Sequence, residues 1–143
     1  TFLNVEGGYP LVIGNRMGNS DRMPWMRRTV NRWMSRRISG LAGVPLPDTQ
    51  CGFRLVNLPL WNQLRFETRQ FEIESEMVLA YITAGCKIKF VPIQTIYRSE
   101  RSKIRPVGDT IRWLKWYFRA RRRLASEGIC LTALPGKKLQ SVR

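Results

Sequence analysis

Short apolar runs alternate along the chain with segments in which apolar residues recur every three or four positions. The run at 11–13, bounded by a proline and a glycine, predicts a short buried strand. From Pro24, the three- and four-residue spacing predicts an amphipathic helix that extends to about residue 40, where glycines at 40 and 43 end it. Residues 53–56 predict a second strand.

The same two periods continue in the second half of the chain. Residues 71–84 have helical spacing and stop at Gly85. Residues 87–93 alternate polar and apolar side chains, which predicts a third strand that resumes at 95–97 after the interruption by proline. Strands and helices that alternate in this order indicate an α/β or α+β architecture.

A last helix is predicted over residues 107–126. On a helical wheel most of its cations fall on one side, and aromatic residues fill much of the rest. This pattern suits a helix lying in a membrane interface, and the alternative is a surface helix that packs its aromatic residues on the domain. Three successive aromatic residues at 116–118 cannot all face one core, so we favour the membrane surface. The expected contact residues are Arg112, Trp113, Lys115, Trp116, Tyr117 and Arg119.

Charge is the unusual feature of the composition. The 143 residues, 43% of them hydrophobic, suit one globular domain and exclude wholesale disorder. Lys and Arg number 25 against 10 Asp and Glu, which gives a net charge of +15. Such an excess implies an anionic partner: nucleic acid, a phosphate-bearing substrate or acidic lipid. Arginine supplies 19 of these cations, and its planar guanidinium matches phosphate oxygens.

The absence of histidine excludes several chemistries within this chain. Neither a Ser-His or Cys-His nucleophile pair nor a zinc site with histidine ligands can form. The three cysteines are too widely spaced for a metal or redox motif, and we interpret them as reduced thiols. No stretch approaches the roughly 20 apolar residues that span a bilayer.

Two short stretches in the first third suggest an anion site. Arg16 follows the first predicted strand, at the place where open α/β sheets bind ligands, although a lone arginine there is more often a surface cation. Arg27, Asn31 and Ser35 follow in steps of four on the next helix, on a side that borders its apolar stripe. Arg28 and Arg32 lie beside this face. Two or three guanidiniums there could hold a phosphate, and a solvated basic face is the alternative.

Two later stretches add carboxylates and a second basic cluster. Asp48 begins the segment Asp-Thr-Gln-Cys-Gly-Phe-Arg, and Glu76 lies on the following helix among four of the ten carboxylates. A carboxylate near such a pocket could orient sugar hydroxyls, bind a metal or pair with arginine, whereas Glu67 and Glu72 are expected on the helix surface. The loop at 98–105 carries four cations and two hydroxyls, which suit either a diphosphate clamp or a mobile basic linker.

The ordered set of these stretches resembles the C-terminal half of a family 2 glycosyltransferase, over about residues 5 to 115. The set comprises Val-Ile-Gly-Asn-Arg, a Pro-led basic helix, Asp-Thr-Gln-Cys-Gly-Phe-Arg, Phe-Glu-x-Glu-x-Glu, Val-Pro-Ile with Thr-Ile-Tyr-Arg, Ser-Lys-Ile and Asp-Thr. It is most similar to the branch of dolichyl-phosphate mannosyltransferases and polyprenyl-phosphate glycosyltransferases. The resemblance implies a partial GT-A-type α/β sheet with flanking helices, followed by the amphipathic interfacial helix.

The resemblance also implies the reaction and its participants. A sugar passes, with inversion, from a UDP- or GDP-linked donor to a polyprenyl or dolichyl phosphate. The enzyme is peripheral, on the cytoplasmic face of a membrane with an anionic surface, and nucleic acid is not the favoured partner. A divalent cation, Mg or Mn, is expected to assist, with its ligands mostly in a preceding half of the enzyme.

The resemblance also assigns the family's binding and catalytic roles to individual residues of this sequence. By the resemblance, Arg16, Arg27 and Asn31 bind the acceptor phosphate, although the family often has serine at the position of Asn31. The catalytic residues would be Asp48 and Glu76. The donor diphosphate would be bound by Arg98, Ser102 and Lys103, and no metal ligand is assigned in this chain.

One departure from the family pattern changes the expectation for activity. The chain has no Asp-x-Asp, the metal-binding motif that the family carries in its N-terminal half. We therefore expect residues 1–106 to be the C-terminal half of a catalytic domain, 107–126 its membrane-surface helix and 127–143 a tail, inactive alone. A nucleic-acid-binding module and a non-catalytic membrane-surface interaction protein are the alternatives.

Overall fold

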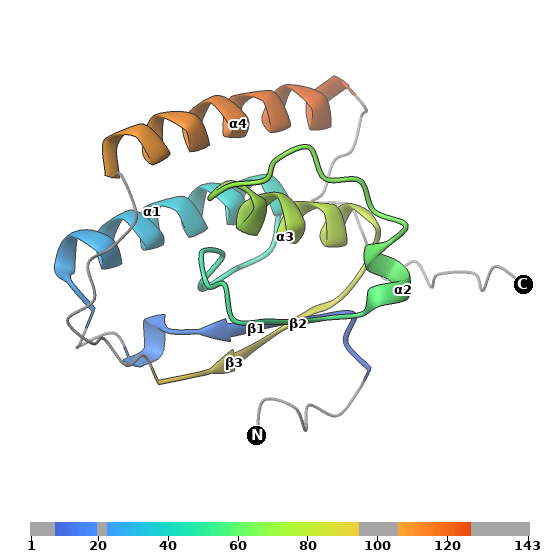
Figure 1. Ribbon diagram of the computed structural model, residues 1–143, viewed down its shortest axis with the longest axis horizontal. Coiled ribbons are helices and arrows are strands. Elements are labelled where there is room, and N and C mark those ends of the chain that lie inside the picture. Colours follow the sequence, from blue (N-terminus) through green and yellow to red (C-terminus); the bar gives the residue numbers. More distant parts are fainter. Residues whose placement is uncertain (1–7, 20–22, 95–105, 127–143) are drawn as a thin grey trace, which may run out of the picture.

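Three short strands form one mixed sheet (Figure 1). The computed structural model describes residues 8–19, 23–94 and 106–126, and within them the strand order is β2-β1-β3. The strands are β1 (Leu11–Asn15), β2 (Arg54–Val56) and β3 (Ile88–Pro92). The central strand β1 runs antiparallel to β2 and parallel to β3. The predicted α/β class and strands at 11–13, 53–56 and 87–93 are confirmed, whereas 95–97 lies outside the described residues.

Helix α1 (Trp25–Ala42) begins directly after Pro24, as the sequence predicts. The helix continues through Gly40 and ends two residues later, because Gly43 adopts a left-handed conformation with φ 66° that few other residues tolerate. The apolar stripe of α1 packs into the core, whereas several arginines of the helix are exposed. The helix has 18 residues although four of its positions are β-branched or glycine, which lowers its intrinsic helix propensity. Burial of its apolar stripe in the core therefore accounts for its stability.

Helix α3 (Ile73–Thr83) is the central helix of the domain and is buried along most of its length. Its position between the sheet and the outer helix explains why polar as well as apolar residues of α3 are buried. The predicted stop is confirmed, since Gly85 has a φ of 75°. A short helix α2 (Leu58–Trp61), capped by the Asn57 side chain, and a 3-10 turn η1 (Met17–Asn19) were not predicted.

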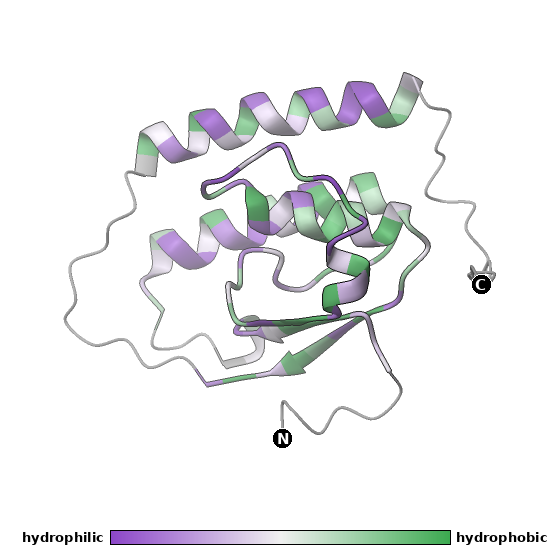
Figure 2. Ribbon diagram, turned by 45° about the vertical axis from the view of Figure 1, so that its right-hand side comes forward, coloured by the Kyte–Doolittle hydropathy of each residue, from purple (hydrophilic) through white to green (hydrophobic). Residues whose placement is uncertain are grey.

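The helices stack on one side of the sheet in layers, with α4 (Pro106–Ser126) outermost (Figure 1). Apolar residues, drawn green, are frequent along the strands and α3, whereas polar residues, drawn purple, alternate with apolar ones along α4 (Figure 2). One core cluster joins side chains from β1, α1, α3 and α4. The predicted helix over 107–126 is thus confirmed, and it is integral to the core.

The burial of α4 corrects the prediction that its aromatic residues face lipid. Trp113, Trp116 and Tyr117 are 0%, 5% and 9% exposed, and only the third member of the aromatic run, Phe118, points outward. Trp113 reaches Trp33 of α1, with ring centroids 5.4 Å apart, and also packs against α3. Because α4 packs on two helices at once, the buried arc is wider than a single contact face would allow. No helix in the described ranges is long and apolar enough to cross a membrane.

The cations of α4 are exposed, in agreement with the helical wheel, but one of them has a structural role. Lys115 and Arg119 face solvent. The Nε of Arg112 lies 2.7 Å from Oε1 of Glu72, a residue that was expected on the helix surface and is instead buried at the start of α3. This ion pair ties α4 to α3 across the segment that precedes α3.

Candidate functional site

The carboxyl ends of two parallel strands meet at one edge of the sheet. Asn15 at the end of β1 pairs with Pro92 at the end of β3, and the backbone N–H of Ile93 donates to the carbonyl of Asn15 at 3.1 Å. The antiparallel β2 begins at this same edge, because Arg54 lies opposite Ile13. The segment that leaves β1 and the loop that leads into β2 are therefore brought together there. We call residues 48–54 the Asp48 loop and this place the carboxyl edge.

A buried ion pair joins these two segments. The side chain of Arg16, 15% exposed, donates from Nε and Nη2 to the two oxygens of Asp48, each at 2.8 Å. The backbone N–H of Arg16 also donates to Asp48 at 3.0 Å, and Asp48 is fully buried. A bidentate pair of this kind fixes both the position and the plane of the guanidinium.

Polar contacts from two helices hold the rest of the Asp48 loop. The Ser35 hydroxyl of α1 accepts from the backbone N–H of Thr49 at 2.9 Å. The Gln50 amide donates to the hydroxyls of Thr49 and Ser75, at 3.0 and 2.7 Å. Ser75, on α3, also accepts from the indole N–H of Trp113 at 2.9 Å, so a chain of hydrogen bonds connects α1, the loop, α3 and α4.

Arg54 closes the loop from its other end. Its guanidinium donates to the backbone carbonyls of Cys51, Thr49 and Glu74, at 2.8 to 2.9 Å. A loop with this many constraints is a rigid support of the kind on which proteins mount binding groups.

Close packing accounts for Gly14, the glycine that bounds the first apolar run of the sequence. A Cβ atom at this position would lie 2.5 Å from Cδ1 of Ile93 and 3.2 Å from the sulfur of Cys51. The groups that approach Gly14 are thus side chains of the fold itself. Burial raises the pKa of the Cys51 thiol, so this cysteine is neutral at physiological pH.

Two further charged groups lie at the Asp48 loop: Arg54 at its end and Glu74 of α3 beside it. Burial lowers the pKa of Arg54 to about 10, and the nearby Glu74 carboxylate opposes this shift. Burial also raises the pKa of Glu74, whose Oε2 atom is buried without a hydrogen-bond partner. The carboxyl edge therefore contains two acids, of which Asp48 is paired with arginine and Glu74 is poorly solvated.

The pKa of Glu74 leads to a testable pH dependence. Because the folded state raises this pKa above the unfolded value of 4.5, it binds the proton more tightly than the unfolded chain does. The contribution of Glu74 to stability is therefore greatest at pH values below the unfolded pKa of 4.5. This contribution is lost as the pH rises through the higher pKa of the folded state. Glu74→Gln is expected to remove this loss, so that urea denaturation shows the variant gaining stability relative to wild type over that window. A constant difference at all pH values would contradict the assignment.

The residues assigned to the acceptor phosphate lie at or near the carboxyl edge. Arg16 is at the edge itself, and Arg27 is half-buried in the first turn of α1. Asn31 is buried one turn later, where its amide contacts the sulfur of Met23 at 4.0 Å. The prediction that the face with Arg27, Asn31 and Ser35 borders the core is confirmed. Arg98, Ser102 and Lys103, assigned to the donor diphosphate, lie outside the described residues.

The two residues assigned to catalysis are in different parts of the molecule. Asp48 has both oxygens engaged by Arg16. Glu76 accepts hydrogen bonds from the backbone N–H groups of Glu67 and Thr68, at 2.8 and 2.9 Å, and so anchors the segment before α3. Among the described residues no hydrogen bond or ion pair joins Asp48 to Glu76. The geometry gives both carboxylates positioning roles.

The sequence interpretation missed Gln50, Ser75 and Glu74. Their importance depends on burial and on contacts across the sheet, which periodicity alone does not reveal. The only available signal for Gln50 was its place between two residues of a singled-out motif. Glu74 was indistinguishable from its acidic neighbours at 72 and 76, because all three alternate along the same short segment.

The divalent cation implied by the resemblance finds no ligand set in this part of the protein. Within residues 8–19, 23–94 and 106–126 there is no group of three or more acidic or cysteine side chains that could hold a metal ion. The buried carboxylate of Asp48 is also committed to Arg16. The described residues therefore do not fit a metal by themselves, and no catalytic step is derived through one.

Comparison with known proteins leaves the family open. No family model matches the chain, and no solved structure matches it. The chain is similar to the uncharacterized protein MJ1222 of Methanocaldococcus jannaschii, with 28% identity over 95 residues. The aligned region covers 63% of this chain but 39% of that protein, so the chain spans well under half of the relative's length.

Proposed function

We propose that this chain forms part of a membrane-surface glycosyltransferase of the family 2 type, with a GT-A-like fold. It transfers a sugar from a UDP- or GDP-linked donor to a polyprenyl or dolichyl phosphate. The observation that carries the proposal is the bidentate pair between Arg16 and Asp48. It joins two of the motif stretches, 32 residues apart in sequence, at the edge where open α/β sheets bind ligands.

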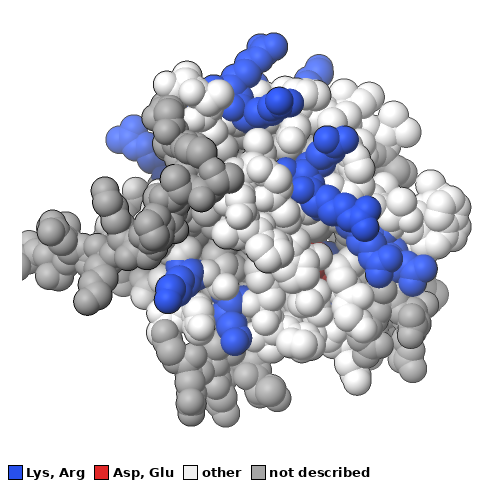
Figure 3. All heavy atoms as spheres, turned by 180° about the vertical axis from the view of Figure 1, so that it is seen from behind, with Lys and Arg blue, Asp and Glu red and all other residues white. Residues whose placement is uncertain are grey.

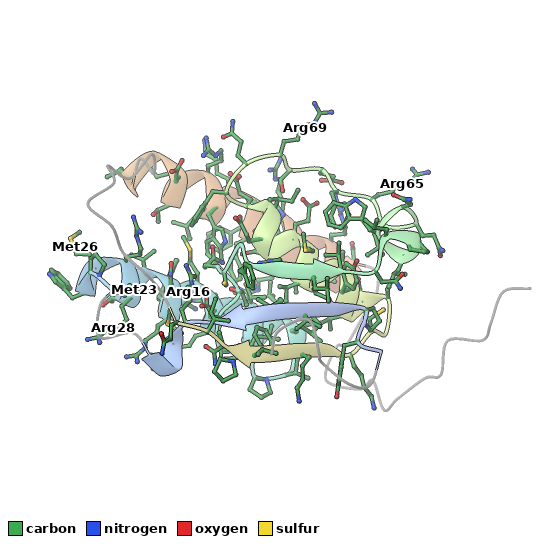
Figure 4. All side chains as sticks on the ribbon, turned by 60° about the horizontal axis from the view of Figure 1, so that its bottom comes forward. Arg16, Met23, Met26, Arg28, Arg65 and Arg69 are labelled. Atoms are coloured by element: carbon green, nitrogen blue, oxygen red, sulfur yellow. The ribbon has the colours of Figure 1, made fainter. Side chains whose placement is uncertain are left out.

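The charge at the carboxyl edge suits an anionic acceptor. Asp48 compensates the charge of Arg16, so the attraction for phosphate comes mainly from the start of α1. Arg27 and Arg28 lie in its first turn, where the helix dipole adds partial positive charge. Arg16, Met23 and Arg28 gather at this end of the molecule (Figure 4). The face seen from behind carries many basic side chains and almost no acidic ones (Figure 3).

Exposed apolar side chains at the same end supply a membrane contact. Trp25 and Met26 are 71% and 59% exposed on the first turn of α1, and Val107 and Ile111 are exposed on the first turns of α4. Both helix starts lie at one end of the molecule in Figures 1 and 2. Apolar side chains interspersed with arginine are typical of surfaces that insert shallowly among lipid headgroups. Membrane contact is therefore proposed at this end, in place of the buried aromatic side of α4.

The proposed reaction is a direct displacement. An oxygen of the lipid phosphate attacks the anomeric carbon of the sugar, and the bond from that carbon to the nucleotide diphosphate breaks with inversion. A phosphate is ionised at neutral pH, so the attack requires no general base and the absence of histidine is no obstacle. Arg27 would orient the acceptor phosphate. Asp48 would hold the guanidinium of Arg16 in a fixed plane at the same site. By the resemblance, Arg98, Ser102 and Lys103 would neutralise the departing diphosphate.

Binding of the acceptor phosphate is tested with phosphatidylcholine vesicles that contain polyprenyl phosphate. Reference vesicles contain phosphatidylserine at matched surface charge. Arg27→Ala is expected to weaken binding to the polyprenyl-phosphate vesicles by about tenfold, the effect of one lost charge-assisted contact. Arg36→Ala is the matched control, because it removes an exposed arginine of the same helix away from the carboxyl edge. Vesicle flotation measures both.

Two results would count against this proposal. If both arginine variants lose the same affinity, binding reflects general electrostatic attraction. If the chain binds DNA or RNA with a steep salt dependence and ignores polyprenyl phosphate, the nucleic-acid-binding alternative is favoured. A preference for polyprenyl phosphate over phosphatidylserine that depends on Arg27 supports the proposal.

A further inference from the structure

A surface pocket of about 250 Å³ lies between α3, α4 and the segment that precedes α3. Except for Glu76, its helical lining comes from the C-terminal halves of α3 and α4, so it is at the opposite end of the molecule from the carboxyl edge (Figure 1). Figure 4 shows the same separation, with Arg65 at one end and Arg16 at the other. The pocket therefore plays no part in the site described above.

The pocket has an apolar floor. Trp116 and Leu79 form part of it and are almost fully buried, and the small side chains of Ala80 and Ala120 leave the space open. Leu124 extends the apolar surface toward the end of α4. This floor would exclude water from one side of a bound molecule.

The rim is basic, and its acids are already engaged. Glu76 accepts backbone hydrogen bonds through both oxygens, and Glu67 pairs with Arg123 at 2.6 Å. Arg65 and Arg119 also line the pocket and are exposed, and neither has an ion-pair partner among the described residues. Three arginines thus line the pocket against two carboxylates, and two of these arginines have no ion-pair partner among the described residues.

We propose that this pocket binds a phosphate monoester attached to a small apolar body. The guanidiniums of Arg65 and Arg119 would hold the phosphate oxygens, and the apolar part would lie on Trp116 and the two alanines. The volume is below the roughly 300–1,000 Å³ of sites for drug-sized molecules, so it suits a headgroup with its first carbons. The source of that group is either an anionic lipid or a soluble phosphate ester.

Calorimetry of the full chain tests this proposal with three probes: short-chain dihexanoyl phosphatidic acid, dihexanoyl phosphatidylcholine and n-butyl phosphate, a soluble monoester with an apolar body. Phosphatidic acid is expected to bind, and phosphatidylcholine is expected to bind at least tenfold more weakly. Arg119→Ala should weaken the binding of phosphatidic acid about tenfold. Arg121→Ala is the matched control, since it removes an exposed arginine of α4 that does not line the pocket, and its affinity should stay within twofold.

A second variant tests the cavity without changing the charge. Ala120→Phe fills the pocket and is expected to abolish binding, with an unchanged circular dichroism spectrum as the check on folding. Binding of n-butyl phosphate as tight as that of phosphatidic acid identifies a soluble ester as the source, and weaker binding identifies lipid. The proposal is overturned if neither phosphate ester binds, if Arg121→Ala and Arg119→Ala lose equal affinity, or if Ala120→Phe binds normally. Arg27→Ala should leave this binding unchanged, which separates the outcome from that at the carboxyl edge.

Discussion

Replacing Arg16 with leucine is expected to lower the free energy of unfolding by about 3–5 kcal/mol. The substitution leaves Asp48, which is fully buried, without the guanidinium that satisfies both of its oxygens. An uncompensated buried carboxylate costs more than the pair itself contributes, because desolvation is no longer offset. Urea denaturation measures the loss.

A double-mutant cycle separates the ion pair from simple loss of packing. Asp48→Asn alone should cost less than Arg16→Leu, since the remaining arginine is partly exposed and can be hydrated. The double variant Arg16→Leu/Asp48→Asn should be more stable than the sum of the two losses predicts, by about 1–3 kcal/mol. Strictly additive losses would mean that the two side chains do not stabilise one another.

Trp113→Ala is expected to destabilise the protein by a similar amount, about 3–5 kcal/mol. Trp113 is fully buried, stacks on Tyr117 and donates a hydrogen bond to Ser75. Its removal leaves a large cavity between α1, α3 and α4, and it also leaves the Ser75 hydroxyl with one partner fewer. Thermal or urea unfolding, followed by the signal of the remaining tryptophans, measures the effect.

Phe118→Ala is the matched control, because this neighbouring aromatic residue of α4 is 52% exposed. Its effect on the free energy of unfolding should be within about 0.5 kcal/mol. The opposite ranking, with Phe118 more important than Trp113, would restore the view that α4 is a separate interfacial helix. That view would also be restored if Trp113→Ala abolished vesicle binding without lowering the free energy of unfolding.

The elements with simple periodicity could be predicted from the sequence. The strand at β1 is a continuous apolar run between helix- and strand-breaking residues, and α1 follows a proline at a spacing of three and four. Gly43 and Gly85 end their helices because the left-handed backbone there favours glycine. These patterns involve only residues that are close in sequence, so they can be recognised without knowledge of the tertiary structure.

The partners of each face could not be predicted, because they depend on contacts distant in sequence. The helical wheel for α4 correctly separated cations from aromatic residues. The prediction that the aromatic side contacts lipid was wrong. The surface that the aromatic side contacts is protein, with Trp33 and Ser75 from two different helices. The same limit applies to Asp48 and Glu76, whose carboxylates looked alike in sequence and engage an arginine and backbone amides respectively.

The positive charge of the chain divides among several uses. Arg16, Arg54 and Arg112 are structural, since each is held in the fold by carboxylates or backbone carbonyls. The start of α1 and the pocket beside α4 carry cations that are better placed for external anions. A net charge of +15 therefore overstates the charge that any one ligand would meet.

Transfer of a labelled sugar tests the central proposal most directly. The protein is expressed from its complete gene and incubated with polyprenyl phosphate and a series of UDP- and GDP-linked sugars, and the organic extract is assayed for glycosylated lipid. We expect one donor to yield labelled lipid, and Lys103→Ala to reduce turnover at least about tenfold. A folded protein that binds membranes but transfers sugar from none of the donors would contradict the proposed function.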